Sequence, residues 1–169
     1  MKTTKKGFTL IELIVVIAII GVLAAILVPS MLGYVKKSKV SSANSTASTL
    51  QKAINTTLIE VDEETQDAGS ITSISHTKAA TTVHIGGSIP SGATAAGIYA
   101  KIANYMEKAQ KLEFNAQCEG AACTAVAVCL DDTYTGTAPG GVVTVDNYKD
   151  YKGTSNLSKA LSGAVKKAS

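Results

Sequence analysis

The stretch from Phe8 to Val28 limits what this chain can fold into more than any other feature. It has 21 residues and is apolar except for Thr9 and Glu12. A helix of about 20 residues is long enough to cross the hydrocarbon core of a bilayer. The stretch therefore predicts one membrane-spanning helix near the start of the chain.

Charge is distributed unevenly around this stretch. The chain has 16 basic residues, all of them lysines, and 13 acidic residues, and three lysines precede the apolar stretch: Lys2, Lys5 and Lys6. Lysines beside a membrane helix stay on the cytoplasmic side, which predicts that the C-terminal part lies outside. The net charge of +3 thus belongs to the first few residues. Because the rest of the chain is balanced, no nucleic-acid partner is expected.

Glu12 separates the possible explanations of the apolar stretch. A secretory signal peptide cut near Ala24 or Ala25 fits its length, and so does an uncut membrane anchor. Neither explains the carboxylate, which costs on the order of 2.5–3.5 kcal/mol inside a membrane helix. A charge kept at such a position suggests a later partner of opposite sign.

The segment Lys5-Lys6-Gly7-Phe8-Thr9-Leu10-Ile11-Glu12 resembles the processing site of type IV prepilins and of type II secretion pseudopilins. The resemblance implies that a membrane-embedded prepilin peptidase cuts after Gly7 and methylates the new amine of Phe8. It also implies that Glu12 directs assembly, and the amine of Phe8 in a neighbouring subunit can supply its opposite charge. Pro29 matches a proline that family members carry near the end of the membrane stretch. The close match covers approximately residues 1–35.

The helix is expected to continue beyond the membrane. Apolar or small residues recur three, four or eight apart from Val35 to Val61, which is the pattern of one face of an amphipathic helix. Gly21 and Pro29 are expected to weaken this spine, because glycine costs roughly 1 kcal/mol in a helix and proline about 3. The chain is thus expected to have four parts: a leader at 1–7, a membrane and assembly half of the spine at 8–28, an amphipathic half at 29–66, and a globular part at 67–169.

The globular part is expected to add a small antiparallel sheet to the spine helix. This is an α+β layout, and the fold of the family that the N-terminus resembles is the same arrangement. The expected elements are strands at Thr81–Ile85, Leu112–Cys118, Cys123–Leu130 and Gly141–Val145, a helix at Ala96–Leu112, and a short helix around Leu157–Val165.

Three cysteines lie close together in the sequence, at 118, 123 and 129. Cys118 and Cys123 flank a four-residue hairpin loop, so they would face each other within disulfide range. We predict this disulfide, with Cys129 free. A bond between Cys118 and Cys129 is the alternative, because the family that the N-terminus resembles often closes its C-terminal region with a larger disulfide loop.

Signals for catalysis and for cofactors are weak. His76 and His84 have no Cys, Asp or Glu at metal-ligand spacing, so we interpret them as ordinary surface or loop histidines. Asp131 and Asp132 could contribute to a calcium site, but without further ligands they indicate an exposed turn. No enzyme activity, metal or cofactor is expected.

The resemblance therefore implies a structural subunit of a type IV pilus, used for adhesion, motility or uptake. Its expected partners are other copies of itself in a helical homopolymer, the prepilin peptidase, a membrane assembly platform, and membrane lipid before assembly. The subunit would span the cytoplasmic membrane before assembly and lie in an extracellular pilus afterwards. A pseudopilin of a type II secretion system is the alternative. A membrane-anchored secreted enzyme or binding protein is a remoter one.

Overall fold

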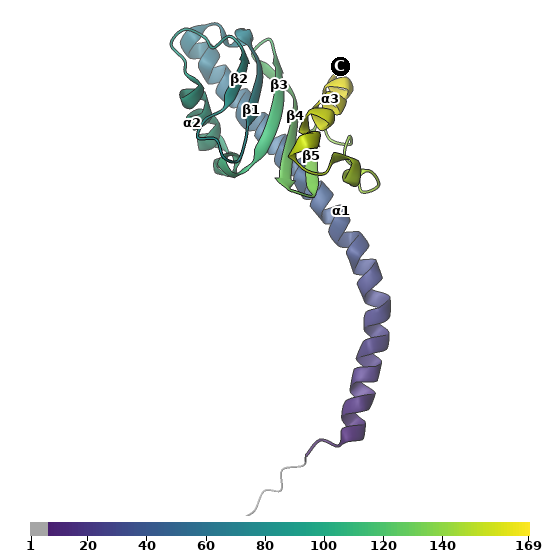
Figure 1. The fold of residues 1–169 in the computed structure, drawn as a ribbon. Coiled ribbons are helices and arrows are strands. Elements are labelled where there is room, and N and C mark those ends of the chain that lie inside the picture. Colours follow the sequence, from purple (N-terminus) through teal and green to yellow (C-terminus); the bar gives the residue numbers. More distant parts are fainter. Residues whose placement is uncertain (1–6) are drawn as a thin grey trace, which may run out of the picture. The chain divides into compact units, whose positions relative to one another are not determined.

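The computed structural model describes residues 7–169 (Figure 1). Of the expected leader at 1–7, only Gly7 is therefore among the described residues. The chain divides into two compact units, Met1–Lys36 and Lys37–Ser169. One helix, α1, is assigned from Leu10 to Thr65 and contributes to both units. Each unit is described by itself below.

The Lys37–Ser169 unit combines the second part of α1 with a five-stranded antiparallel sheet, which confirms the α+β prediction. The order of the strands across the sheet is β2-β1-β3-β4-β5, and the unit also contains two further α-helices, α2 and α3 (Figure 1). The bounds are β1 Ile71–His76, β2 His84–Gly87, α2 Ala95–Tyr105, β3 Glu113–Glu119, β4 Ala122–Asp131, β5 Tyr134–Ala138 and α3 Leu157–Ala168.

The two faces of the sheet are covered by different helices. Successive side chains of a strand point to opposite faces, so β4 contributes to two separate cores. Val126 and Val128 join the large cluster that contains Leu50, Ile54 and Leu58 of α1 and Phe114 of β3. Ala127 and Cys129 pack instead with Leu157 and Ala160 of α3. The sheet is thus buried between α1 and α3.

Strand β5 approaches α1 closely at Gly136. A Cβ atom at this position would overlap with the carbonyl carbon and oxygen of Ala43, so only glycine lets the strand lie here. The next residue of α1, Asn44, accepts a hydrogen bond from the backbone N–H of Thr137 at 2.9 Å. Its amide group donates to the carbonyl oxygen of Val143 at 3.2 Å. Asn44 therefore attaches both β5 and the segment after it to the helix.

The C-terminal end of α1 is attached to α2 by polar contacts. Lys101 of α2 forms ion pairs with Glu60 at 3.2 Å and with Glu64 at 2.8 Å, and the hydroxyl of Tyr105 donates to Glu60. The bonds from Tyr105 and Lys101 hold the pKa of Glu60 below its usual value. These partners compensate for the unfavourable position of acidic residues at a helix C-terminus.

Several expected elements of the globular part are corrected by the structure. The strand expected at Gly141–Val145 is a loop, and the neighbour of β4 is instead β5 at Tyr134–Ala138. The helix expected to reach Leu112 ends at Tyr105 and is followed by a 3-10 helix, Glu107–Lys111. The strand expected at Thr81–Ile85 lies later, as β2.

Strand β1 was not expected from the sequence. It lies between β2 and β3 in the sheet, and its residues Ile71 and Ile74 are both fully buried. A register shift between Ile71 and Ser73 interrupts the alternation of buried and exposed positions, so the two isoleucines stand three residues apart and not two. The bulge hides the period that would have revealed the strand.

Candidate functional site

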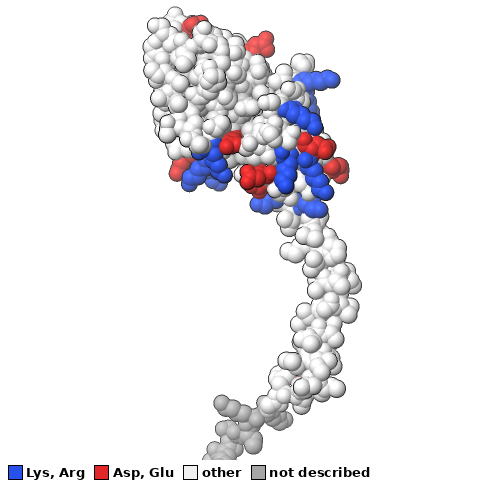
Figure 2. All heavy atoms as spheres, in the orientation of Figure 1, with Lys and Arg blue, Asp and Glu red and all other residues white. Residues whose placement is uncertain are grey.

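The described part of the first unit presents an apolar helical surface. Every residue from Gly7 to Lys36 is exposed, and Phe8 keeps 81% of its surface accessible. Helix α1 is long and apolar enough to cross a membrane by length and composition. In Figure 2, the visible face of the narrow helical stretch between the grey residues and the first blue side chains carries no charged side chain. Such a surface can be covered by lipid or by other apolar helices.

The start of α1 carries a capping box formed by Thr9 and Glu12. The carboxylate of Glu12 accepts hydrogen bonds from the backbone N–H of Thr9 at 2.8 Å and from its hydroxyl at 2.6 Å. In return, the hydroxyl of Thr9 accepts from the backbone N–H of Glu12 at 3.4 Å. This is the reciprocal arrangement of a Thr-x-x-Glu N-terminus. Glu12 therefore has a partner within its own chain.

A threonine three residues before a glutamate at the head of an apolar run is a sequence signal for this capping box, and the expectation for Glu12 leaves it out. Capping explains part of what makes a carboxylate tolerable at this position. It satisfies the carboxylate with hydrogen bonds but leaves its negative charge without a cation. The prediction that Glu12 pairs with an amine in assembly thus stays open and needs a test that separates the two roles.

Gly21 and Pro29 both lie inside α1, which is assigned as helix throughout. An added Cβ at Gly21 would meet no atom within 4 Å, so packing in this chain does not require glycine there. Pro29 has no N–H to donate to the carbonyl of Ala25, which leaves that carbonyl without its usual helical bond. The helix break expected here concerns the assembled state and stays a prediction.

The cysteines are all buried, and all three are free thiols in the structure. In the register of β3 and β4, Cys118 lies directly opposite Cys123. Both belong to the core under α1, whereas Cys129 packs under α3 on the opposite face of the sheet. This arrangement supports the pairing of Cys118 with Cys123, which stays a prediction.

His76 corrects the expectation of two surface histidines. Its side chain is buried, with 3% of its surface exposed, and it stacks on Tyr99 and Phe114 with ring centroids 5.0 and 5.7 Å away. Its ring nitrogens lie 2.7 Å from the carbonyl oxygen of Leu112 and 3.2 Å from that of Ala80. His76 is therefore part of the core and its hydrogen bonding, while His84 is exposed.

Asp131, which was considered for metal binding, stabilises a turn instead. Asp131 accepts hydrogen bonds from the backbone N–H groups of Thr133 and Tyr134 at 2.9 and 2.8 Å, which makes it part of the turn between β4 and β5. Within residues 7–169, no group of three or more His, Cys, Asp and Glu side chains is arranged to hold a metal ion.

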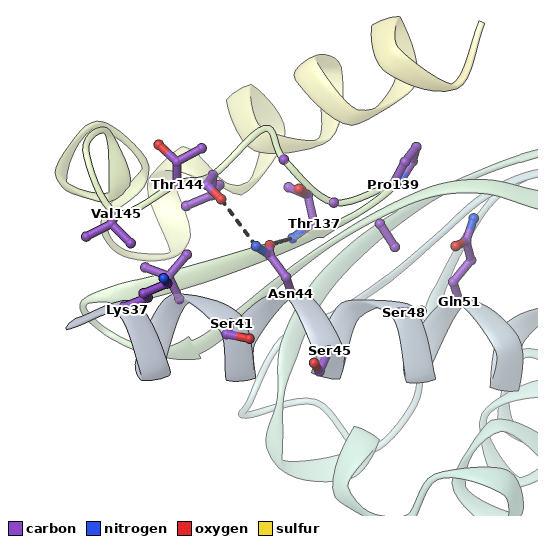
Figure 3. A pocket seen from close by; sticks show the side chains of 15 residues that line it. Lys37, Ser41, Asn44, Ser45, Ser48, Gln51, Thr137, Pro139, Thr144 and Val145 are labelled. Atoms are coloured by element: carbon purple, nitrogen blue, oxygen red, sulfur yellow. Dashed lines mark hydrogen bonds between the residues drawn. The ribbon is translucent and has the colours of Figure 1, made fainter. Parts of the chain in front are cut away.

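An open groove of about 550 Å³ lies between α1 and the segment that follows β5 (Figure 3). Asn44 spans it with the two hydrogen bonds described above. Ser41, Ser45 and Ser48 line the helix side, but no carboxylate, histidine or cysteine lines the groove. The lining is mostly small and uncharged, with Lys37 as its one ionisable side chain.

Charged side chains do not form a patch of one sign on the visible face of the Lys37–Ser169 unit. Figure 2 shows lysines and acidic residues intermixed toward one end of this unit, with few charges over the rest of that face. A nucleic-acid-binding surface would need clustered positive charge. The distribution on this face does not provide it.

Comparisons with known proteins identify one family model and several relatives of this chain. Residues 2–28 match the family model described as the prokaryotic N-terminal methylation motif. The chain is 48% identical over 63 residues to a type IV major fimbrial protein FimA of Dichelobacter nodosus, covering 37% of this chain and 40% of that protein. It is 46% identical over 59 residues to a fimbrial protein of Pseudomonas aeruginosa, covering 35% and 38%.

A further relative, the fimbrial protein EcpC of Eikenella corrodens, is 58% identical over 43 residues, which is 25% of this chain and 28% of that protein. The chain thus spans at most 40% of the length of these three curated relatives. No solved structure matches the chain. For these three relatives the matched part is at most 37% of this chain.

Proposed function

We propose that this chain, whose N-terminal segment is that of the type IV pilin family, is a structural subunit of a type IV pilus. The observation that carries the proposal is the processing and methylation motif at the head of an exposed apolar helix. The family consists of structural subunits and not of enzymes. The part of this helix up to Lys36 is exposed at every residue, and such an apolar surface needs other helices or lipid to cover it, as polymerisation and membrane insertion would.

In this proposal the four parts expected from the sequence have successive roles. Residues 1–7 are a leader that the prepilin peptidase removes. Residues 8–28 hold the subunit in the cytoplasmic membrane and then pack with the same residues of other copies in an extracellular pilus. Residues 29–66 and 67–169 form the rest of the spine and the globular part. A membrane assembly platform would transfer the subunit from lipid to the filament.

The assembly step depends on Phe8 and Glu12. Cleavage after Gly7 creates a positive amine on Phe8 at the head of the helix, and Glu12 of a neighbouring copy provides the negative partner. Apolar side chains gain little from leaving lipid for each other, because lipid tails are equally apolar. A charge pair between copies adds both attraction and register, since each buried charge is costly until it is paired.

The function is tested by electron microscopy of material sheared from the cell surface, with mass spectrometry of its main protein. Long filaments made of this chain are expected, and they should vanish when the chain is deleted. Loss of protein secretion on deletion, with no filaments made of this chain, would favour a type II secretion pseudopilin instead. Detection of the chain only as a monomer in membranes would favour a membrane-anchored protein of another class.

Processing is expected to leave a mature chain that starts at Phe8 with a methylated amine. The physical reason is the junction between a basic leader and an apolar helix, which places the bond after Gly7 where a membrane-embedded peptidase can reach it. Mass spectrometry of the N-terminal peptide from purified filaments measures this directly. An intact Met1, or a start within the apolar stretch near Ile26, would contradict the assignment.

The segment from Gly21 to Pro29 is expected to be the flexible part of the spine in the filament. Pro29 removes a helical hydrogen bond and Gly21 lowers the intrinsic stability of the helix, so packing forces can unwind the segment and let the fibre stretch. A filament map should show non-helical backbone there, and the double variant Gly21→Ala, Pro29→Ala should restore helix and reduce extension under force. An unbroken helix in the unsubstituted filament would refute the unwinding.

A further inference from the structure

The hairpin between β3 and β4 brings two cysteines into register. Glu119 pairs with Ala122, so only Gly120 and Ala121 form the turn, and their φ values of 58° and 63° are those of a type I′ turn. Cys118 and Cys123 pair directly behind it. Opposite residues of an antiparallel pair have Cα atoms about 4.5–5.5 Å apart, which lies within the range that a disulfide spans.

Their side chains also point to the same side of the sheet. Cys118 is 2% exposed and Cys123 is 4% exposed, and both belong to the core under α1. The Cys118 thiol is near enough to be the main cause that raises the pKa of the Cys123 thiol. Cys129 packs on the opposite face with Leu157, and the sheet itself separates it from the other two.

Helix α1 holds the backbone of this hairpin end in place. Asn55 accepts a hydrogen bond from the backbone N–H of Cys123 at 2.6 Å. One turn earlier, the amide group of Gln51 donates to the carbonyl oxygens of Cys123 at 3.0 Å and of Thr124 at 3.1 Å. Because these residues bind β4 at and beside the cysteine, they oppose slippage of the register that places Cys123 opposite Cys118.

We propose that Cys118 and Cys123 are a modification site at which a disulfide forms in the exported protein, while Cys129 stays a thiol. The bond fixes the pairing register of β3 and β4, which is the register in which Gln51 and Asn55 bind β4. The oxidant is the disulfide of a thiol–disulfide exchange partner outside the cytoplasmic membrane, where such bonds persist. The place of oxidation rests on the proposed function, whereas the pairing rests on the register alone.

The reaction balances as two exchange steps. The thiolate of one cysteine attacks the donor disulfide, forms a mixed disulfide and releases one donor thiol. The thiolate of the second cysteine then attacks the mixed disulfide and releases the second donor thiol. The two cysteines lose two electrons and two protons in total, and the donor disulfide is reduced to two thiols.

The surroundings of Cys118 and Cys123 indicate whether the disulfide forms before or after folding. Both thiols are buried, so a donor disulfide reaches neither of them in the folded chain. The neighbouring Cys118 thiol and burial also raise the pKa of the Cys123 thiol, which keeps it protonated. Oxidation is therefore faster in the unfolded chain, as it emerges from the membrane. Once folded, the bond is shielded from reductants by the same burial.

Peptide mapping of the full chain under non-reducing conditions tests the proposal. A Glu-specific protease cuts after Glu119 and separates Cys118 from the other two cysteines. Elastase then cuts among the small residues from Ala125 to Val128 and separates Cys123 from Cys129. We expect a peptide pair that joins Cys118 to Cys123, together with an alkylated Cys129. Any crosslink that contains Cys129, or three alkylated cysteines in the refolded chain described next, would overturn the pairing.

Two preparations of the chain test separately which cysteines form the disulfide and where in the cell it forms. One is the chain taken from the cell surface under alkylating conditions, and the other is the full chain in detergent, unfolded, reduced and refolded with oxidised and reduced glutathione. A Cys118–Cys123 bond in both supports the whole proposal. The bond in the refolded chain alone supports the pairing and overturns oxidation after export, which would count against the proposed function.

The matched variants give a second measurement. Cys129→Ser is expected to keep the crosslink, whereas Cys118→Ser and Cys123→Ser are expected to lose it. In the refolded chain, reduction of the bond should lower the melting temperature of the globular part by roughly 5 °C, because the open hairpin regains conformational freedom when unfolded. The melting temperature of the double variant Cys118→Ser, Cys123→Ser should not respond to the reductant, and an equal response there would contradict the proposal.

Discussion

Glu12→Ala is expected to insert into the membrane but to reduce the yield of surface filaments on the order of 100-fold or more. Insertion should become easier because a charge that costs about 2.5–3.5 kcal/mol in a membrane helix is gone. Assembly should fail because the amine of Phe8 would be left without its partner, and breaking a buried ion pair costs about 3–5 kcal/mol. Membrane fractionation measures insertion, and sheared filament yield measures assembly.

The capping box at Thr9 offers a competing explanation for such a loss, and two further variants separate the explanations. Glu12→Gln keeps a side-chain oxygen that can accept from Thr9, so the cap is retained while the charge is lost. Thr9→Ala removes the hydroxyl that contacts Glu12 but keeps the carboxylate. If charge pairing controls assembly, Glu12→Gln should be nearly as defective as Glu12→Ala, and Thr9→Ala should assemble.

The opposite result would contradict the proposal that Glu12 pairs with the amine of Phe8. Filaments from Glu12→Gln at normal yield, with none from Thr9→Ala, would mean that Glu12 acts as a helix cap in its own chain. Loss of both would indicate that the cap positions the carboxylate for its partner. A circular dichroism spectrum of each variant in detergent checks that α1 remains helical.

Gly136→Ala is expected to destabilise the globular part by about 3 kcal/mol or more. The new methyl group would overlap with the carbonyl carbon and oxygen of Ala43 and would stand 2.6 Å from the backbone nitrogen of Asn44. These are backbone atoms of a helix, so they cannot turn away as a flexible side chain would. The strand would have to move, which would strain the bond from Thr137 to Asn44. Denaturant unfolding of the full chain in detergent, followed by near-ultraviolet circular dichroism, measures the loss.

Gly140→Ala is the matched control for this substitution. A Cβ atom at Gly140 would have only the carbonyl oxygen of Thr137 nearby, at 4.0 Å, which is an ordinary contact distance. Its free energy of unfolding is expected to stay within about 0.5 kcal/mol of the original value. Equal effects of the two substitutions would show that the contact between β5 and α1 does not limit the packing of this unit.

The long N-terminal helix could be predicted from the sequence because its determinants are local. A helix that is able to cross a membrane by length and composition needs only a sufficiently long apolar stretch, and the residues that resemble a processing site are contiguous, from Lys5 to Glu12. The amphipathic continuation of α1 and the α3 helix follow from periodic spacing within one segment. The hairpin of β3 and β4 was likewise readable, because its strands are neighbours in sequence and a short turn joins them.

What only the tertiary structure decided concerns contacts between distant segments. Strand β1 forms although a bulge hides its period, because β2 and β3 pair with it on both sides. The burial of His76 depends on Tyr99 and Phe114, which lie far away in the chain. The need for glycine at position 136 arises from a helix residue more than ninety positions earlier, Ala43. Such requirements come from the close packing of elements against each other. The residues adjacent in sequence therefore do not indicate them.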